Sequence, residues 1–152
     1  MNIAIAGYGF VGKAIEAYLQ KTEHTTQIID PKYSNMSVLD TKCDGIIIGS
    51  PTRFGNMAAP LKFFIDNLST LWVNNDLVGK PSGAFCSTAS LHGGQEATLL
   101  SMMVPLLHLG TVIVSLPYKF HDLNHTQSGG TPYGPSHWSD HNNNKDLNEK
   151  LF

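Results

Sequence analysis

Residues 44–56 read DGIIIGSPTRFGN, and this stretch decides the fold of the chain. Its first part, Asp44–Gly49, is a short apolar run that ends at glycine, which is typical of a strand buried on both faces of a parallel sheet. Its second part, Ser50–Asn56, predicts a turn at the carboxyl end of that strand. Because ligands bind at the carboxyl ends of strands in open α/β sheets, this turn is a candidate binding loop.

Strand-like and helix-like segments alternate on both sides of residues 44–56. We expect strands at Asn2–Ala6, Thr26–Ile29, Gly83–Ser87 and Thr111–Leu116, and helices after Gly12, at Ala58–Leu68 and at Gln95–Leu109, where Pro105 kinks or caps the helix. The alternation predicts an α/β fold with three layers, in which helices cover both faces of a doubly wound, five-stranded parallel sheet. Residues 1–152 are expected to form one domain, since no repeat and no second pattern follows.

The end of the chain differs from the rest. His121–Asn144 is rich in Gly, Ser, Asn, His and Pro, which predicts a long loop that is either functional or mobile. Asp146–Phe152 begins a helical pattern. The preceding segment Gln95–Leu109 has almost no polar face, so that helix is either fully buried or part of a subunit interface.

Composition bounds the class of the protein. With 41% hydrophobic and 14% charged residues and a net charge of −2, the chain is expected to fold and lacks the clustered Lys and Arg of nucleic-acid or membrane partners. Cys43 and Cys86 are widely separated, which favours free thiols, and the absence of a signal-peptide pattern favours the cytoplasm. We expect no metal site, although His137 and His141 have the i, i+4 spacing of a helical ligand pair.

A glycine-rich turn follows the first expected strand. Gly7, Tyr8, Gly9, Phe10, Val11 and Gly12 form a GxGxxG pattern, in which backbone N–H groups and a helix dipole can bind phosphate. Asp30, at the end of the second strand, is placed to bind a ribose hydroxyl. The alternative is that the glycines serve only a tight turn and Asp30 only ends a strand. Residues 1–43 resemble the Rossmann-like, NAD-binding start of NAD-dependent dehydrogenases, especially the nucleotide-sugar (UDP-glucose) dehydrogenases.

Two loops at the carboxyl ends of central strands are suited to a flat ring with polar edges. They offer backbone N–H groups, an arginine, an aromatic face and small residues that permit close approach. The first ring loop consists of Pro51, Thr52, Arg53, Phe54, Gly55 and Asn56, and the second of Ser87, Thr88, Ala89, Ser90, Leu91, His92, Gly93, Gly94 and Gln95.

Four motifs, in order along residues 44–140, are similar to those of the flavodoxin-like NAD(P)H:quinone oxidoreductases, the tryptophan-repressor-binding-protein family. They are residues 49–56, 71–72, 87–96 and 129–134. The resemblance implies a sheet order of 2-1-3-4-5, FMN held by the two ring loops, and hydride transfer from NAD(P)H to a quinone. It also implies that Trp72 and Tyr133 lie at the substrate pocket and that the protein is a homo-oligomer, a dimer or tetramer. Without the resemblance, Arg53 would be read as part of a surface ion pair and Trp72 as core.

Departures from the family leave alternatives open. Gly7–Gly12 stands where the family binds the FMN phosphate through Ser and Thr side chains, so weakened FMN affinity is expected. Leu109 stands where the family has a histidine, and the final helix stops at Phe152 soon after it starts. The change in resemblance near residues 43–48 leads to the hypothesis of a chimera. The alternatives are a divergent natural member, a module that binds NAD or another nucleotide without turnover, and an engineered fold without activity.

Overall fold

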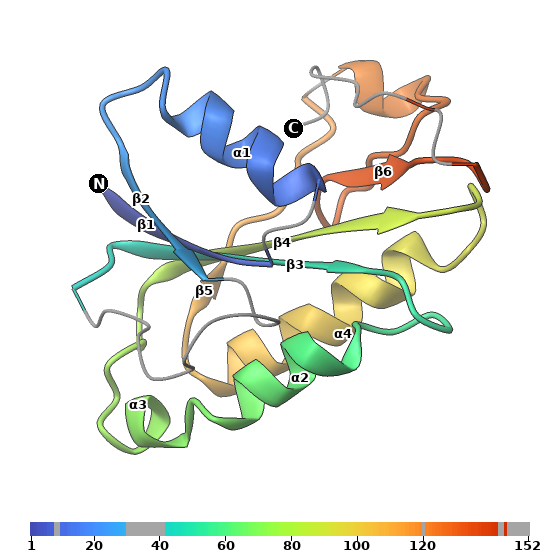
Figure 1. Ribbon diagram of the computed structural model, residues 1–152. Coiled ribbons are helices and arrows are strands. Elements are labelled where there is room, and N and C mark those ends of the chain that lie inside the picture. The colour runs from blue at the N-terminus through green and yellow to red at the C-terminus, as the bar shows by residue number, and fades with distance from the viewer. Residues whose placement is uncertain (8–9, 30–41, 120, 143–144, 146–152) are drawn as a thin grey trace.

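The computed structural model describes residues 1–7, 10–29, 42–119, 121–142 and 145, which share one sheet with helices on both faces (Figure 1). The strands are β1 (Asn2–Ala6), β2 (Thr25–Ile29), β3 (Gly45–Pro51), β4 (Pro81–Thr88), β5 (Val112–Ile113) and β6 (Ser136–Trp138). The helices are α1 (Phe10–Leu19), α2 (Ala59–Asp66), α3 (Ser69–Val73) and α4 (Gln95–His108), with a 3-10 turn, η1, at His121–Asn124. The expected helix start at Asp146–Phe152 lies outside the described residues.

The sheet is parallel, and its order β2-β1-β3-β4-β5 confirms the predicted 2-1-3-4-5 arrangement. The central strand β3 is the isoleucine run of residues 44–56, and it pairs with β1 on one side and β4 on the other. Because all these strands run in the same direction, the loops that follow β1, β3 and β4 leave the sheet at one edge.

The expected fifth strand, Thr111–Leu116, is divided in the structure. Only Val112–Ile113 forms β5, beside the beginning of β4, and β6 pairs with the end of β4. Since β3 occupies the other edge of β4, strands β5 and β6 follow one another along the same edge. β6 lies within His121–Asn144, which was predicted to be a loop, because a strand of three residues leaves no periodic pattern to read.

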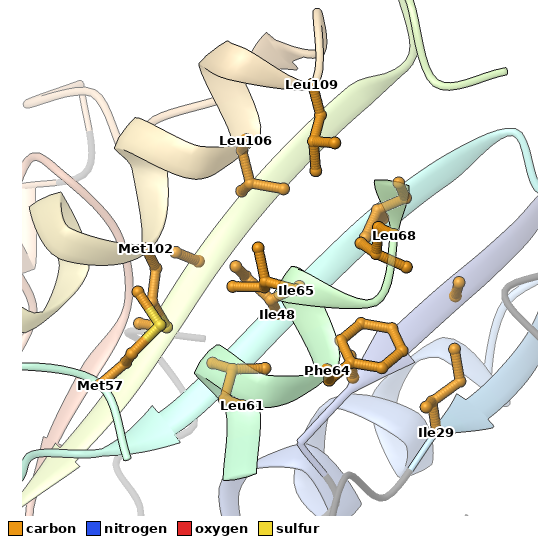
Figure 2. Packing of buried hydrophobic residues seen from close by; sticks show 14 of the residues in the cluster. Ile29, Ile48, Met57, Leu61, Phe64, Ile65, Leu68, Met102, Leu106 and Leu109 are labelled. Atoms are coloured by element: carbon orange, nitrogen blue, oxygen red, sulfur yellow. The ribbon is translucent and has the colours of Figure 1, made fainter. Parts of the chain in front are cut away.

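The helices cover the two faces unequally among the described residues. Helix α1 packs on a face with Ile5 and Phe85, while α2 and α4 cover the opposite face (Figure 1). Figure 2 shows the larger cluster on that second face, where residues from α2 and α4 meet Ile48 of β3. Each fully buried large apolar side chain contributes about 1.5–3 kcal/mol, so this layer fixes α4, and with it the second ring loop, against the sheet.

The helices also refine the sequence predictions. The expected helix Ala58–Leu68 ends at Asp66 and is followed by the separate α3, and Pro105 lies inside α4. The apolar helix α4 buries Leu99, Met102, Met103 and Leu106 but exposes Leu100, Val104 and Leu107. Leu109, at the end of α4, is buried in the core. No helix in the described ranges is both long and apolar enough to cross a bilayer.

Candidate functional site

The first ring loop is a tight hairpin. The N–H of Arg53 donates to the carbonyl of Asn56 at 2.8 Å, and the N–H of Asn56 donates back at 3.1 Å. Phe54 and Gly55 between them have φ values of 52° and 75°, the signs of a type I′ turn. A phenylalanine is strained at such a position, and its side chain here is fully exposed (106%). The turn therefore presents an unsupported aromatic ring to solvent.

The second ring loop lies directly against the first. Gly94, which precedes α4, has a φ of 97°, and a Cβ atom there would come within 2.9 Å of the Gly55 Cα. The Thr52 N–H donates to the Ser87 carbonyl at 2.9 Å, and the Thr98 hydroxyl donates to Thr52 Oγ1 at 3.0 Å. The structure thus brings together the two loops that the sequence singled out, at the carboxyl ends of β3 and β4.

Both loops present backbone donors. In the part of the chain that the structure describes, the N–H groups of Phe54, Gly55, Leu91 and His92 donate to no protein acceptor. The side chains of Phe54, Leu91 and His92 are exposed. A ligand with several acceptor atoms along one edge would satisfy such donors.

A buried polar network supports the second ring loop from below. The Gly130 N–H donates to Ser136 Oγ at 2.8 Å, and the Ser136 hydroxyl donates to Gln95 Oε1. Gln95 Nε2 donates to Thr88 Oγ1 at 3.1 Å, and the Thr88 hydroxyl donates to the Ser90 carbonyl at 2.8 Å. The side chains of Thr88 and Gln95 therefore make their hydrogen bonds to other groups of the protein, and these bonds stabilise the conformation of the second ring loop. Ser136 was not identified from the sequence, because its partner is distant along the chain.

Strand β6 supports the same loop at two further points. The side chain of His137 is only 2% exposed. Its Nδ1 is 3.2 Å from Ser87 Oγ, and its Nε2 is 3.0 Å from the Lys145 carbonyl oxygen. The Trp138 indole N–H donates to the Ala89 carbonyl at 3.2 Å, and the Lys145 ammonium lies 3.0 Å from the centroid of that indole. His137 is in strand β6, so its i, i+4 spacing from His141 does not place the two side chains on one face of a helix. No group of three or more metal-ligating side chains gathers among the described residues.

The Cys86 thiol lies beneath the two loops. Burial raises its pKa to about 12, against a smaller lowering by the hydrogen bond to Thr52. The thiol therefore stays protonated at neutral pH and is a poor nucleophile.

In the glycine-rich turn, Gly7 and Gly12 both stand where a side chain would collide with the backbone. Gly7 has a φ of 110°, and a Cβ there would lie 2.1 Å from the Gly49 carbonyl oxygen. A Cβ on Gly12 would lie 2.3 Å from the Gly7 carbonyl oxygen, so Gly12 lets α1 pack closely on the turn. Phe10 and Val11 begin α1. Tyr8, Gly9 and Asp30 lie outside the described residues.

The structure does not bring Trp72 to the ring loops within one chain. Trp72 is in α3, which leads to the amino end of β4, whereas the ring loops are at the carboxyl ends (Figure 1). It is half-exposed and stacks on His108 with ring centroids 5.8 Å apart. Tyr133 is partly exposed in a two-residue turn between Thr131 and Gly134, just before β6. Its place at a substrate pocket stays a prediction.

Comparisons with known proteins agree with this geometry. A family model described as NADPH-dependent FMN reductase matches residues 7–121. A protein of Rhizobium meliloti (strain 1021) named NAD(P)H dehydrogenase (quinone) 3 is 51% identical over 105 residues, which cover 68% of this chain and 50% of that protein. The crystal structure of a flavodoxin, WrbA-like protein from Agrobacterium tumefaciens matches with a TM-score of 0.62 and 28% identity, over 77% of this chain and 78% of that one.

The chain spans about half the length of the curated relatives that it matches. The match to the family model runs across residues 43–48, where the change in resemblance suggested a join. The comparisons support neither the chimera hypothesis nor a kinship with nucleotide-sugar dehydrogenases. With more than half of its residues matched by one family model, on a sheet of the predicted order, the chain belongs to the NADPH-dependent FMN reductase family.

Proposed function

We propose that the chain acts as an FMN-dependent NAD(P)H:quinone oxidoreductase. The observation that carries the proposal is Phe54, which is fully exposed and strained at the tip of the first ring loop. Strained positions of this kind cluster at active sites and ligand-binding loops. Family membership supports FMN as that molecule, and the relatives' names support NAD(P)H and a quinone as its reaction partners.

The described residues fit the ring of FMN. The N–H groups of Phe54, Gly55, Leu91 and His92 would donate to acceptor atoms on its polar edge, and the phenyl ring of Phe54 would cover one face. A Cβ on Gly55 would meet nothing within 4 Å, so the space beside Phe54 is open. Arg53, whose guanidinium donates to the Thr52 carbonyl at 3.2 Å, would add positive charge at the rim.

The phosphate of FMN would bind at the glycine-rich turn. This turn contains Gly7 at the end of β1 and leads into α1, whose first N–H groups carry the positive end of the helix dipole. It would act through backbone donors in place of the Ser and Thr side chains that the family resemblance led us to expect. An FMN affinity below that of relatives with hydroxyl side chains follows from this difference.

The bound cofactor would supply the hydride chemistry between NAD(P)H and the quinone. The chain itself would bind the ring, orient it and exclude water from the face that Phe54 covers. A nucleophile from the chain is not needed, which agrees with a buried Cys86 thiol of raised pKa.

A second copy of the chain is part of the proposal. The outer surfaces of α2, α3 and α4 expose the apolar side chains Phe63, Trp72, Val104 and Leu107. Burying such a patch between copies would explain why α4 has an apolar outer face. Sedimentation at several protein concentrations tests this, and a monomer at all of them would contradict it. The proposal also includes one domain over residues 1–152 and a place in the cytoplasm.

The function is tested by loading the protein with FMN and following NADH and NADPH oxidation with 1,4-benzoquinone. Phe54→Ala is expected to lower kcat/KM about fivefold, since the loss of an aromatic contact is worth about 1 kcal/mol. Tyr18→Ala, which truncates another exposed aromatic on α1, is the matched control and is expected to leave the rate unchanged. FMN that binds without turnover of either nucleotide would contradict the proposal, and saturable NAD binding without FMN binding would favour a nucleotide-binding module.

A further inference from the structure

Strand β6 places a buried histidine directly behind a residue of the second ring loop. Ser87 and His137 are register partners in the parallel pair of β4 and β6, so their side chains lie next to one another on the same face of the sheet. Ser87 Oγ is 3.2 Å from His137 Nδ1, and His137 Nε2 is 3.0 Å from the Lys145 carbonyl oxygen. His137 is almost fully buried, whereas Ser87 is half-buried at the site.

The contact with Lys145 fixes the direction of both hydrogen bonds. A carbonyl oxygen only accepts, so the hydrogen of the neutral imidazole must be on Nε2. Nδ1 then carries a lone pair and accepts from the Ser87 hydroxyl. The only proton of that hydroxyl therefore points inward, and its remaining lone pairs are left for a ligand. Ser87 is thus held as an acceptor.

Ser87 thus adds a side-chain acceptor to the second ring loop. The N–H groups of Phe54, Gly55, Leu91 and His92 in the two ring loops are donors. A ligand that fits both must offer several acceptors and at least one donor. A flavin does so, because it has carbonyl oxygens beside an imide N–H on its ring and hydroxyl groups on its ribityl chain.

We propose that His137 is a positioning residue, which holds Ser87 as the hydrogen-bond acceptor for an N–H or O–H group of the flavin. This inference rests on the proposed function for the identity of the ligand. It adds a specificity element: molecules of similar shape that carry only acceptors at this point leave the Ser87 lone pairs unsatisfied.

Four variants test the proposal by titration with FMN, riboflavin and lumiflavin, followed through flavin fluorescence. Ser87→Ala is expected to weaken FMN binding about fivefold, the effect of one neutral hydrogen bond of about 1 kcal/mol. His137→Gln retains a donor for the Lys145 carbonyl but loses the Nδ1 acceptor, and is expected to weaken binding about threefold. His137→Asn retains an acceptor near Nδ1 and is expected to stay within about twofold of the wild type. In the double variant, His137→Gln is expected to add nothing to Ser87→Ala, because it acts only through Ser87.

The three flavins identify the donor. If it is a ribityl hydroxyl, Ser87→Ala weakens FMN and riboflavin but leaves lumiflavin, which has no ribityl chain, unchanged. If it is the imide N–H, all three weaken by a similar factor. A Ser87→Ala variant that binds all three like the wild type would overturn the proposal, and so would additive losses in the double variant.

A readout without flavin separates this inference from the proposed function. In the flavin-free protein, ¹⁵N NMR of the His137 ring is expected to show the Nε2–H tautomer, and Ser87→Ala is expected to shift the Nδ1 resonance. If the wild type binds no flavin, the proposed function fails, while these shifts still test how Ser87 is held. An Nδ1–H tautomer, or an Nδ1 resonance that Ser87→Ala leaves in place, would refute the role of His137.

Discussion

Gln95→Met removes the centre of the buried polar network without leaving a large cavity. Methionine has about the volume of glutamine, but it has only a weakly accepting sulfur for Ser136 and no donor for Thr88. The substitution thus isolates the hydrogen bonds of Gln95, which is 6% exposed at the start of α4, from its packing.

The loss in the free energy of unfolding follows from the hydrogen bonds that Ser136 and Thr88, the two partners of Gln95, would lose. The Ser136 hydroxyl, 1% exposed, would lose its acceptor, which costs about 1–3 kcal/mol for a buried group left unsatisfied. Thr88 would lose one accepted hydrogen bond, about 0.5–1.5 kcal/mol, but would still donate to the Ser90 carbonyl. The apolar methionine offsets part of the loss, so we expect the free energy of unfolding to fall by about 2–3 kcal/mol.

Urea denaturation followed by circular dichroism measures this change, with Glu96→Gln as the control. Glu96 is the exposed neighbour of Gln95 in the first turn of α4, and its substitution is expected to cost less than about 1 kcal/mol. FMN affinity is expected to fall as well, since the network shapes the second ring loop. A Gln95→Met variant as stable as the control would refute the reasoning that these bonds hold β4, β6 and α4 together.

Three further substitutions have distinct signatures. Gly7→Ala places a Cβ atom 2.1 Å from the Gly49 carbonyl oxygen at a φ of 110°, and it is expected to abolish cooperative unfolding in urea. Gly79→Ala is the control, because Gly79 has a φ of 77° but no atom within 4 Å of the added Cβ, and it is expected to lower the free energy of unfolding by only about 1 kcal/mol. Equal effects of the two substitutions would show that the contact with the carbonyl oxygen is unimportant. Phe54→Asn is expected to raise the free energy of unfolding by about 1 kcal/mol, because Asn tolerates a left-handed backbone. It is also expected to weaken FMN binding in a fluorescence titration. A lower free energy of unfolding would contradict the backbone strain at Phe54. Burial raises the pKa of Cys86 from 9.0 to about 12 in the folded protein. Between these pH values only the unfolded chain loses the thiol proton, so the free energy of unfolding falls by up to about 1.4 kcal/mol for each unit by which the pH rises. Cys86→Ala is expected to lack this part of the slope in urea titrations at pH 8 to 11, and an unchanged slope would disprove the assignment.

Local patterns were enough to predict the scaffold. The run Asn2–Ala6 has in the structure the bounds that its apolar pattern predicts, and the isoleucine run of residues 44–56 forms the central β3. Both are buried strands that end at a glycine or a turn, and such strands carry their signal in their own residues. The position of the two ring loops was predictable for the same reason, since a loop that follows a central parallel strand lies at the carboxyl edge of the sheet.

What the sequence did not reveal depends on partners distant along the chain. Strand β6 exists because β4 has a free edge beyond β5, and nothing in Ser136–Trp138 distinguishes it from the surrounding loop. The bonds from Ser136 to Gln95 and from His137 to Ser87 join residues 41 and 50 positions apart. For Trp72, a motif predicted a place at the substrate pocket, and its short helix leads to the amino end of β4, so within one chain that place stays a prediction.

The central claim is that the two ring loops and the glycine-rich turn hold FMN. The most direct test is to saturate the protein with FMN, remove free flavin by desalting and measure the visible absorbance of the protein. We expect a retained flavin spectrum at a ratio of about one FMN per chain, with a lower ratio in Phe54→Ala and an unchanged ratio in Tyr18→Ala. A colourless wild-type protein, or one whose flavin content is the same in all three, would contradict it.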